Sequence, residues 1–171
     1  MQTASGLPIR KRIRLRNFHY GGGCAYYLTI CTYKKQMLFG ECIAGVVSLN
    51  RIGELVRTSW LATEALRPGV VLDEFIVMPN HMHAIIHLPF TVDPEALFRL
   101  VGGFKSHVTS AARAMLSDPE LLVWQKRFND RIIRSGRELE HFREYIRANP
   151  ARWCGSNPGF GTAQPCPTLP I

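Results

Sequence analysis

The sequence contains no long apolar run and no recognisable export signal. None of its 171 residues lies in a stretch of about 18 or more consecutive apolar residues, the length that a transmembrane helix requires. Residues 1–16 are basic and lack the apolar segment that follows the positive end of a signal peptide. We therefore expect a cytoplasmic protein that does not enter the membrane.

Cysteine is scarce and scattered. No C-x-x-C pair and no histidine at zinc-finger spacing accompanies the five cysteines, which argues against a zinc module and against a disulfide framework. We expect reduced thiols, three of them in or beside strands. The five are Cys24, Cys31, Cys42, Cys154 and Cys166.

Acidic residues are few relative to basic ones. The 21 Lys and Arg residues against 13 Asp and Glu residues give a net charge of +8. Five cations are concentrated near the N-terminus, at Arg10, Lys11, Arg12, Arg14 and Arg16. Such a cluster suits a polyanion that is contacted through its phosphates, as in a nucleic acid. A basic surface that only maintains solubility is the alternative.

The length and the apolar content of 46% are sufficient for one buried core. We expect a basic arm over residues 1–22 and one domain over residues 23–153. Residues 154–171 are rich in Gly and Pro and should form a poorly ordered tail.

Runs of β-branched and aromatic residues predict the strands. Only Pro79 and Asn80 separate two of these runs, so the two should pair as an antiparallel hairpin. The last run is expected to be bulged or broken near Asn129. The runs cover residues 25–33, 37–49 (itself a short hairpin), 70–78, 81–88 and 121–134.

Apolar spacing and capping residues predict three helices. Asn50 caps the first, over residues 51–66, and Asp93 followed by Pro94 opens the second. A capping box formed by Ser135 and Glu138 starts the third, which should end at Asn149 because Pro150 follows. The order of elements predicts an α+β fold, a ferredoxin-like sandwich with an antiparallel sheet and helices mainly on one face.

A pair of histidines lies on one of the predicted hairpin strands. Side chains of a strand alternate between faces, so His81 and His83 project from the same side and can bind one divalent ion. His87 shares that face but lies about 13 Å from His83 at about 3.3 Å per residue, too far to join the same ion. H-x-H alone is a weak signal, and a structural role is the more common explanation.

The last predicted helix carries a second candidate group. Its buried stripe contains Phe142 and Ile146, and a neighbouring stripe at i, i+4 spacing contains His141, Tyr145 and Asn149. This stripe would present a phenol and an amide together. A tyrosine beside a core stripe is nevertheless more often a packing residue than a nucleophile.

The sequence resembles the single-tyrosine HUH transposases, in particular the REP-associated tyrosine transposases and their insertion-sequence relatives. Residues 77–86 (VMPNHMHAII) carry this resemblance most specifically. Weaker motifs occur in the same order as in the family and extend the match from about Ile13 to Trp153. They are residues 13–16, 27–32, 38–40, 104–106, 124–125, 132–134 and 145–153.

The resemblance implies an enzyme that nicks and rejoins single-stranded DNA at hairpin-forming repeat ends through a 5′-phosphotyrosine. By position, it implies that His81 and His83 bind Mg²⁺ or Mn²⁺, with Asn149 as a third ligand. It also implies that Tyr145 is the nucleophile. Residues 127–130 (RFND) depart from the family pattern, in which both middle positions are commonly aromatic, and this bears on strand geometry or DNA contacts.

Single-stranded or hairpin DNA is the expected partner. Basic residues would hold its phosphates, although each one alone is as readily an ordinary solvated charge. They are Arg12, Arg14, Arg16, Lys105, Arg131 and Arg134. The resemblance leaves open whether the protein acts as a monomer or as a homodimer.

Two other functions stay open at this point. The first is a non-catalytic DNA-binding regulator derived from a transposase, although all three chemical positions are intact. The second is a metal-dependent hydrolase that activates water with H-x-H and never forms a covalent link to DNA. An assay for DNA that remains attached to denatured protein separates both from the transposase.

Overall fold

The computed structural model describes residues 24–90, 93 and 95–155. Arg12, Arg14, Arg16 and the tail beyond Gly155 lie outside the described residues. None of the described helices has both the length and the apolar character that a membrane-spanning segment requires. The described elements are β1 (Ala25–Cys31), η1 (Tyr33–Lys35), β2 (Gly40–Ile43), β3 (Val46–Leu49), α1 (Arg51–Leu66), β4 (Val71–Met78), β5 (His81–His87), α2 (Ala96–Leu116), β6 (Asn129–Ile133) and α3 (Gly136–Gly155).

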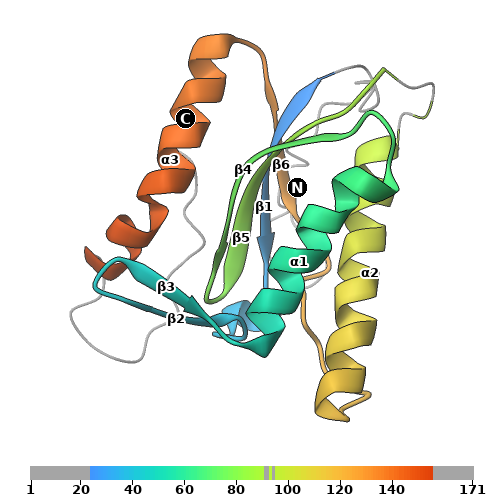
Figure 1. Ribbon diagram of the computed structural model, residues 1–171, viewed down its shortest axis with the longest axis vertical. Helices are drawn as coiled ribbons and strands as arrows, with labels where there is room; N and C mark the ends of the chain where they lie inside the picture. The colour runs from blue at the N-terminus through green and yellow to red at the C-terminus, as the bar shows by residue number, and fades with distance from the viewer. Residues whose placement is uncertain (1–23, 91–92, 94, 156–171) are drawn as a thin grey trace, which may run out of the picture.

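The central feature is an antiparallel sheet with the strand order β4-β5-β1-β6. Helices α1 and α2 cover one face of this sheet, whereas α3 covers the other (Figure 1). The β2–β3 hairpin is inserted between β1 and α1 and contacts α3. The predicted ferredoxin-like α+β fold is therefore confirmed, with two of the three described α-helices on one face.

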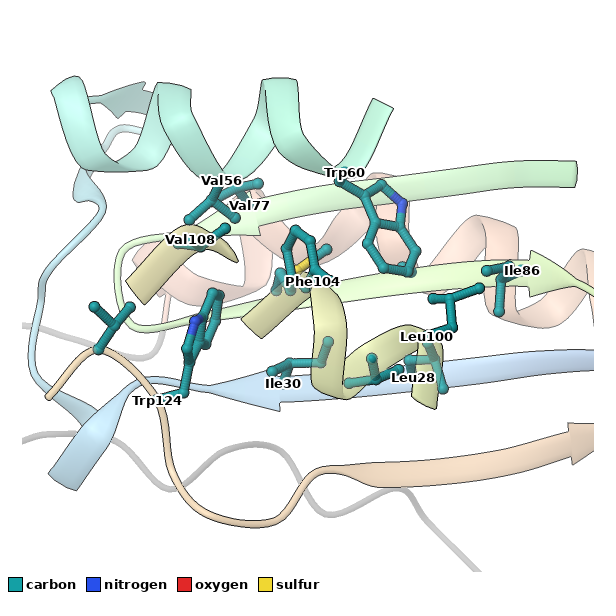
Figure 2. Packing of buried hydrophobic residues seen from close by; sticks show 14 of the residues in the cluster. Leu28, Ile30, Val56, Trp60, Val77, Ile86, Leu100, Phe104, Val108 and Trp124 are labelled. Carbon is teal, nitrogen blue, oxygen red and sulfur yellow. The ribbon is translucent and has the colours of Figure 1, made fainter. Parts of the chain in front are cut away.

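The face covered by α1 and α2 holds the larger core. Trp60 of α1 and Phe104 of α2 pack edge to face, with ring centroids 5.1 Å apart, and Phe104 also contacts Trp124 at 5.7 Å. Figure 2 shows these rings in one cluster with Leu28, Ile30 and Ile86 of the sheet. Aromatic side chains bury large apolar areas, so this cluster supplies most of the hydrophobic stabilisation.

The predicted bounds of α1 are confirmed. The Asn50 side chain accepts hydrogen bonds from the backbone N–H groups of Ile52 and Gly53 at 2.9 and 3.0 Å, which satisfies two otherwise unpaired donors of the first turn. The β2–β3 hairpin and the β4–β5 pair also form where the sequence predicts them.

The predicted strand over residues 121–134 is largely wrong. Only Asn129–Ile133 forms β6, and the preceding segment is irregular apart from an isolated bridge between Thr32 and Trp124. Its apolar side chains, including Val123 and Trp124, are buried in the core, which explains the strand-like pattern. Its carbonyl groups are satisfied in part by side chains rather than by a ladder, as when Arg113 donates to the Leu121 carbonyl at 3.1 Å.

Two predicted helix ends are also wrong. Asp93 accepts a hydrogen bond from the Glu95 N–H at 2.9 Å, but this closes a turn that precedes α2, and the helix begins at Ala96. Helix α3 passes through Pro150 and ends at Gly155. Proline removes one helical hydrogen bond, yet packing of Trp153 against His81, with ring centroids 5.5 Å apart, holds the last turn in place.

Candidate active site

Two imidazoles lie together beneath α3. His81 and His83 are both 0% exposed, and their Nε2 atoms are 3.1 Å apart. Their neighbours Met82 and Ala84 face the opposite core, so the predicted alternation along β5 is confirmed. The pairing of β5 with both β4 and β1 fixes the backbone of this strand on each side.

Asn80 orients the first imidazole. Its Oδ1 atom lies 2.7 Å from His81 Nδ1, and its Nδ2 group donates to the Lys35 carbonyl at 3.4 Å. Because the amide nitrogen is engaged by Lys35, the amide oxygen accepts the proton of His81 Nδ1. The lone pair of His81 therefore resides on Nε2, directed toward His83.

Two hydroxyl groups orient the second imidazole. His83 Nδ1 lies 2.7 Å from Tyr27 Oη and 3.0 Å from Thr29 Oγ1. Both partners come from β1, where Thr29 is the direct cross-strand neighbour of His83. A hydroxyl oxygen can accept the Nδ1 proton, which leaves the Nε2 lone pair available as a ligand.

Burial keeps both imidazoles neutral. It lowers the pKa of His81 to about 4, with a smaller contribution from the charge of Lys35. Burial also lowers the pKa of His83 well below its usual value, and the nearby His81 adds to this effect. A neutral imidazole is the form that can bind a metal ion, so both side chains are in the protonation state that a ligand requires at neutral pH.

The spacing of the pair fits a shared divalent cation. Adjacent ligands at about 2.1 Å from one octahedral ion are about 90° apart and lie about 3.0 Å from each other. The observed Nε2 separation of 3.1 Å is close to this value. Among the described residues, no group of three or more His, Cys, Asp or Glu side chains can hold a metal, so a third ligand from this part of the chain would be of another type, such as an amide.

Helix α3 places the predicted phenol and amide on the same side of the sheet as the imidazoles. The Tyr145 ring lies 5.5 Å from the His83 ring, and the Trp153 ring lies 5.5 Å from the His81 ring. Asn149 falls midway between Tyr145 and Trp153 at i, i+4 spacing, and is 4% exposed. Helical spacing therefore places Asn149 on the same face of α3 as Tyr145 and Trp153.

Tyr145 is itself largely buried, at 9% exposure. Its ring meets Tyr27 edge to face at 6.2 Å, and the Arg152 guanidinium lies 5.2 Å from its centroid. His141, the third member of the predicted stripe, is exposed and is not brought to the imidazoles. His87 also belongs elsewhere, since its Nε2 atom bonds to Asp73 at 2.9 Å.

The basic residues predicted to bind DNA are not all brought to this site. Lys105 lies on α2, across the sheet from the imidazoles, and its amine donates to the carbonyls of Gln125 and Lys126 at 2.6 and 3.2 Å. Burial lowers its pKa. Arg131 lies on β6 and Arg134 directly follows that strand, so both lie near the start of α3.

Arg131 and Arg134 both contact the first turn of α3. The Arg131 side chain forms an ion pair with Glu138 at 2.8 Å and lies 5.4 Å from the centroid of the Phe142 ring. The Arg134 backbone N–H donates to Glu138 at 2.8 Å, and its side chain is exposed. Arg131 therefore lies on the same side of the sheet as the imidazoles, as its cross-strand neighbour Tyr27 does.

Sequence reasoning missed the groups that orient the imidazoles. Asn80 adjoins His81 in the turn, and alternation places Tyr27 and Thr29 on one face of the first strand. The register that brings these residues to His83, more than 50 positions away, depends on strand pairing that a single sequence does not specify.

No family model matches the chain. The sequence is 32% identical over 169 residues to a Haemophilus influenzae protein described as uncharacterized, and the match covers 87% of this chain and 92% of that protein. The structure is similar to that of a REP-associated tyrosine transposase bound to a REP hairpin, with a TM-score of 0.60 and 22% identity over 82% of this chain and 74% of that one.

A candidate transposase from Deinococcus radiodurans is also similar, with a TM-score of 0.48 and 19% identity over 78% of this chain and 94% of that one. The resemblance predicted from the sequence is confirmed at the level of the fold by the REP-associated transposase. The chain belongs to the same family as the Haemophilus influenzae protein and has the fold of a REP-associated tyrosine transposase.

Proposed function

We propose that the protein is a metal-dependent transposase that nicks and rejoins single-stranded DNA, with Tyr145 as its nucleophile. The observation that carries this proposal is the position of the Tyr145 ring, 5.5 Å from the His83 ring on the imidazole face of the sheet. Mg²⁺ or Mn²⁺ would be held by His81, His83 and Asn149. The bound cation would neutralise charge on the scissile phosphate and favour the phenolate.

The chain's own residues account for the remaining chemistry. The Tyr145 oxygen forms a bond to phosphorus, the bond from phosphorus to the 3′ oxygen breaks, and the proton lost from the phenol is balanced by one gained at the 3′-OH. The product is a 5′-phosphotyrosine, which conserves the phosphoester for a later attack by the same or another 3′-OH. Rejoining therefore needs no ATP.

Hairpin DNA with a flanking single strand is the substrate that we propose. The net charge of +8 favours a polyanion, and the REP-associated transposase of the same fold was solved with a REP hairpin. Arg131, which contacts Phe142 and Glu138 of α3, would hold DNA that approaches Tyr145, and Arg134, Arg12, Arg14 and Arg16 would extend this contact. The assignment of Lys105 to DNA stays a prediction.

The test is a covalent transfer assay. Oligonucleotides that carry a hairpin-forming repeat and a flanking single strand are labelled at the 3′ end, because the 5′-phosphotyrosine retains the downstream fragment. Incubation with Mg²⁺ or Mn²⁺ and denaturing electrophoresis should reveal label that migrates with the protein. A 5′ label on the same strand should not transfer.

The Tyr145→Phe variant removes only the hydroxyl and should abolish this adduct while DNA binding is retained. Tyr33→Phe is the matched control and should react as the wild type does. An adduct that survives in Tyr145→Phe contradicts the assignment of the nucleophile. Cleavage without any adduct would instead indicate a hydrolase, and binding without cleavage a regulator.

A further inference from the structure

A bulge in the edge strand β4 directs two consecutive acidic residues to the same face. Leu72 pairs with Ile86 and Phe75 pairs with Ala84, so Asp73 and Glu74 together oppose a single residue of β5. In a regular strand, consecutive side chains point to opposite faces, whereas a bulge re-aims one of them. Both carboxylates consequently face α3, the helix that carries Tyr145.

Each carboxylate binds an arginine of α3. Arg143 donates from Nε and Nη2 to the two oxygens of Asp73 at 2.9 and 2.7 Å, a bidentate geometry. Arg147 donates from Nε and Nη2 to Glu74 Oε1 at 2.9 and 2.7 Å. Glu140 joins the two arginines from within the helix, at 3.2 and 3.3 Å.

His87 completes this network. Its Nε2 atom lies 2.9 Å from Asp73 Oδ2, on the side of the carboxylate that Arg143 also contacts. The hydrogen bonds from Arg143 hold the pKa of Asp73 well below its usual range, with a further contribution from His87. The carboxylate is therefore ionised wherever the protein is folded at ordinary pH. The third histidine of β5 thus supports the attachment of α3 rather than the metal pair.

The two arginines flank Tyr145 in sequence but not in space. Arg143 and Arg147 are four residues apart and share one side of α3, whereas Tyr145, two positions from each, lies about 160–200° around the helix axis. If α3 rotates about its axis, the two arginines and Tyr145 move together. Ion pairs that fix the arginines therefore also fix the direction of Tyr145. Among the α3 side chains that the structure describes, the buried apolar ones are Phe142, Ile146 and Tyr145 itself.

We infer that the Asp73–Arg143 and Glu74–Arg147 ion pairs are positioning elements that set the rotation of α3 and thereby hold Tyr145 toward the imidazole pair. This inference rests on the proposed function for its catalytic consequence. Its structural half, the attachment of α3 to the β4 bulge, can be measured without DNA or metal.

The experiment compares Asp73→Asn and Arg143→Ala with the double variant. The rate of adduct formation at saturating DNA and Mn²⁺ should fall about tenfold to a hundredfold in each, since displacements of about 1 Å at a reacting group have effects of this size. Asp73→Asn raises the net charge by one and Arg143→Ala lowers it by one. A general effect of charge on DNA binding would therefore change the adduct rate in opposite directions in the two variants. Coupling through one ion pair predicts that the double variant is no slower than either single variant.

Amide hydrogen exchange supplies the readout that is independent of activity. Exchange in α3 should accelerate in Asp73→Asn and Arg143→Ala, whereas exchange in α1 should not. Arg143→Lys keeps the charge but loses the bidentate geometry, and should restore part of the rate. Arg137→Ala, which removes the same charge from an exposed position of α3, is the matched control and should match the wild type in both measurements.

The outcomes distinguish this inference from the proposed function. The inference is overturned if amide exchange in α3 of both single variants is as slow as in the wild type. It is also overturned if both variants form the adduct at a rate within twofold of the wild-type rate. If the wild type itself forms no adduct, the proposed function fails, and the positioning of Tyr145 fails with it. Accelerated exchange in the two variants would then show only that the ion pairs attach α3 to the sheet.

Discussion

The two faces of the sheet differ in what holds them together. The face beneath α1 and α2 is closed by a large apolar cluster with Trp60, Phe104 and Trp124 at its centre. The face beneath α3 has only a small apolar cluster, and it buries His81 and His83 as well. The first face therefore stabilises the fold. Burial of polar imidazoles on the second face costs free energy, which the large core offsets.

The difference arises from alternation along a single strand. In β5, Met82, Ala84 and Ile86 point to the large core, and His81 and His83 point to α3. Ion pairs at the edge of the sheet complete the attachment of α3, and they do so without filling the site with apolar side chains. A reactive site of this kind needs a core elsewhere to support it.

The largest expected effect is on the stability of the large core. Trp60→Ala should lower the free energy of unfolding by about 3–5 kcal/mol, because it removes a fully buried side chain and leaves a cavity. Urea denaturation measures this loss. Leu61→Ala, at an exposed position of the same helix, should change the value by less than about 0.5 kcal/mol. If Trp60→Ala lowers adduct formation per folded molecule, the two faces are not independent.

The next effect concerns the face beneath α3 and depends on pH. The pKa of His81 is about 4 in the folded protein and about 6.5 when unfolded. The unfolded chain therefore binds more protons between these pH values. The contribution of His81 to the free energy of unfolding is largest above pH 6.5 and is lost as the pH falls to about 4. His81 alone should contribute a loss of about 3 kcal/mol over this window.

Denaturation of the metal-free protein in a chelator, repeated at several pH values, measures this slope. His81→Gln should reduce it, and added Mn²⁺ should oppose it by binding the neutral imidazoles. The contribution of Asp73 has a different window, since Arg143 lowers the pKa of that carboxyl and its stabilisation is lost only below about pH 3.8. A flat profile between pH 6.5 and 4 would contradict the burial of neutral imidazoles.

A smaller effect is expected from the groups that orient His83. Tyr27→Phe removes the hydroxyl that lies 2.7 Å from His83 Nδ1 and leaves Thr29 in place. Mn²⁺ affinity, measured by calorimetric titration, should fall about tenfold, and the adduct should still form at saturating Mn²⁺. Tyr26→Phe changes the neighbouring residue on the large-core face and should leave the affinity unchanged. Equal losses in both variants would show that the effect is general rather than local.

Local signals in the sequence were sufficient for much of the fold. Asn50 and the apolar spacing after it define α1, and the alternation around His81 and His83 places both imidazoles on one face. The prediction of a strand before β6 was wrong because Val123 and Trp124 are buried although their backbone is irregular. Their apolar pattern in the sequence is the same as that of a strand. The predicted end of the last helix at Asn149 was wrong because packing of the last turn of α3 outweighs the hydrogen bond that Pro150 removes.

The components that join distant parts of the chain lay beyond sequence reasoning. Asp73 and Arg143 are 70 residues apart, and their contact depends on the bulge in β4 and on the placement of α3. Tyr27 reaches His83 only because β1 pairs with β5 in one register. Such contacts follow from tertiary structure, which neither composition nor periodicity encodes directly.

The identity of the nucleophile can be read directly from the covalent product. Tyr145 is the only tyrosine between Arg143 and Arg147, so trypsin releases it in the peptide Glu144–Arg147, while the other four tyrosines lie together within residues 17–34. Mass spectrometry of the adduct after nuclease and trypsin digestion should find the nucleotide on the peptide that contains Tyr145. A nucleotide on the peptide spanning residues 17–34, or on neither, would contradict the assignment of Tyr145 to the imidazole site.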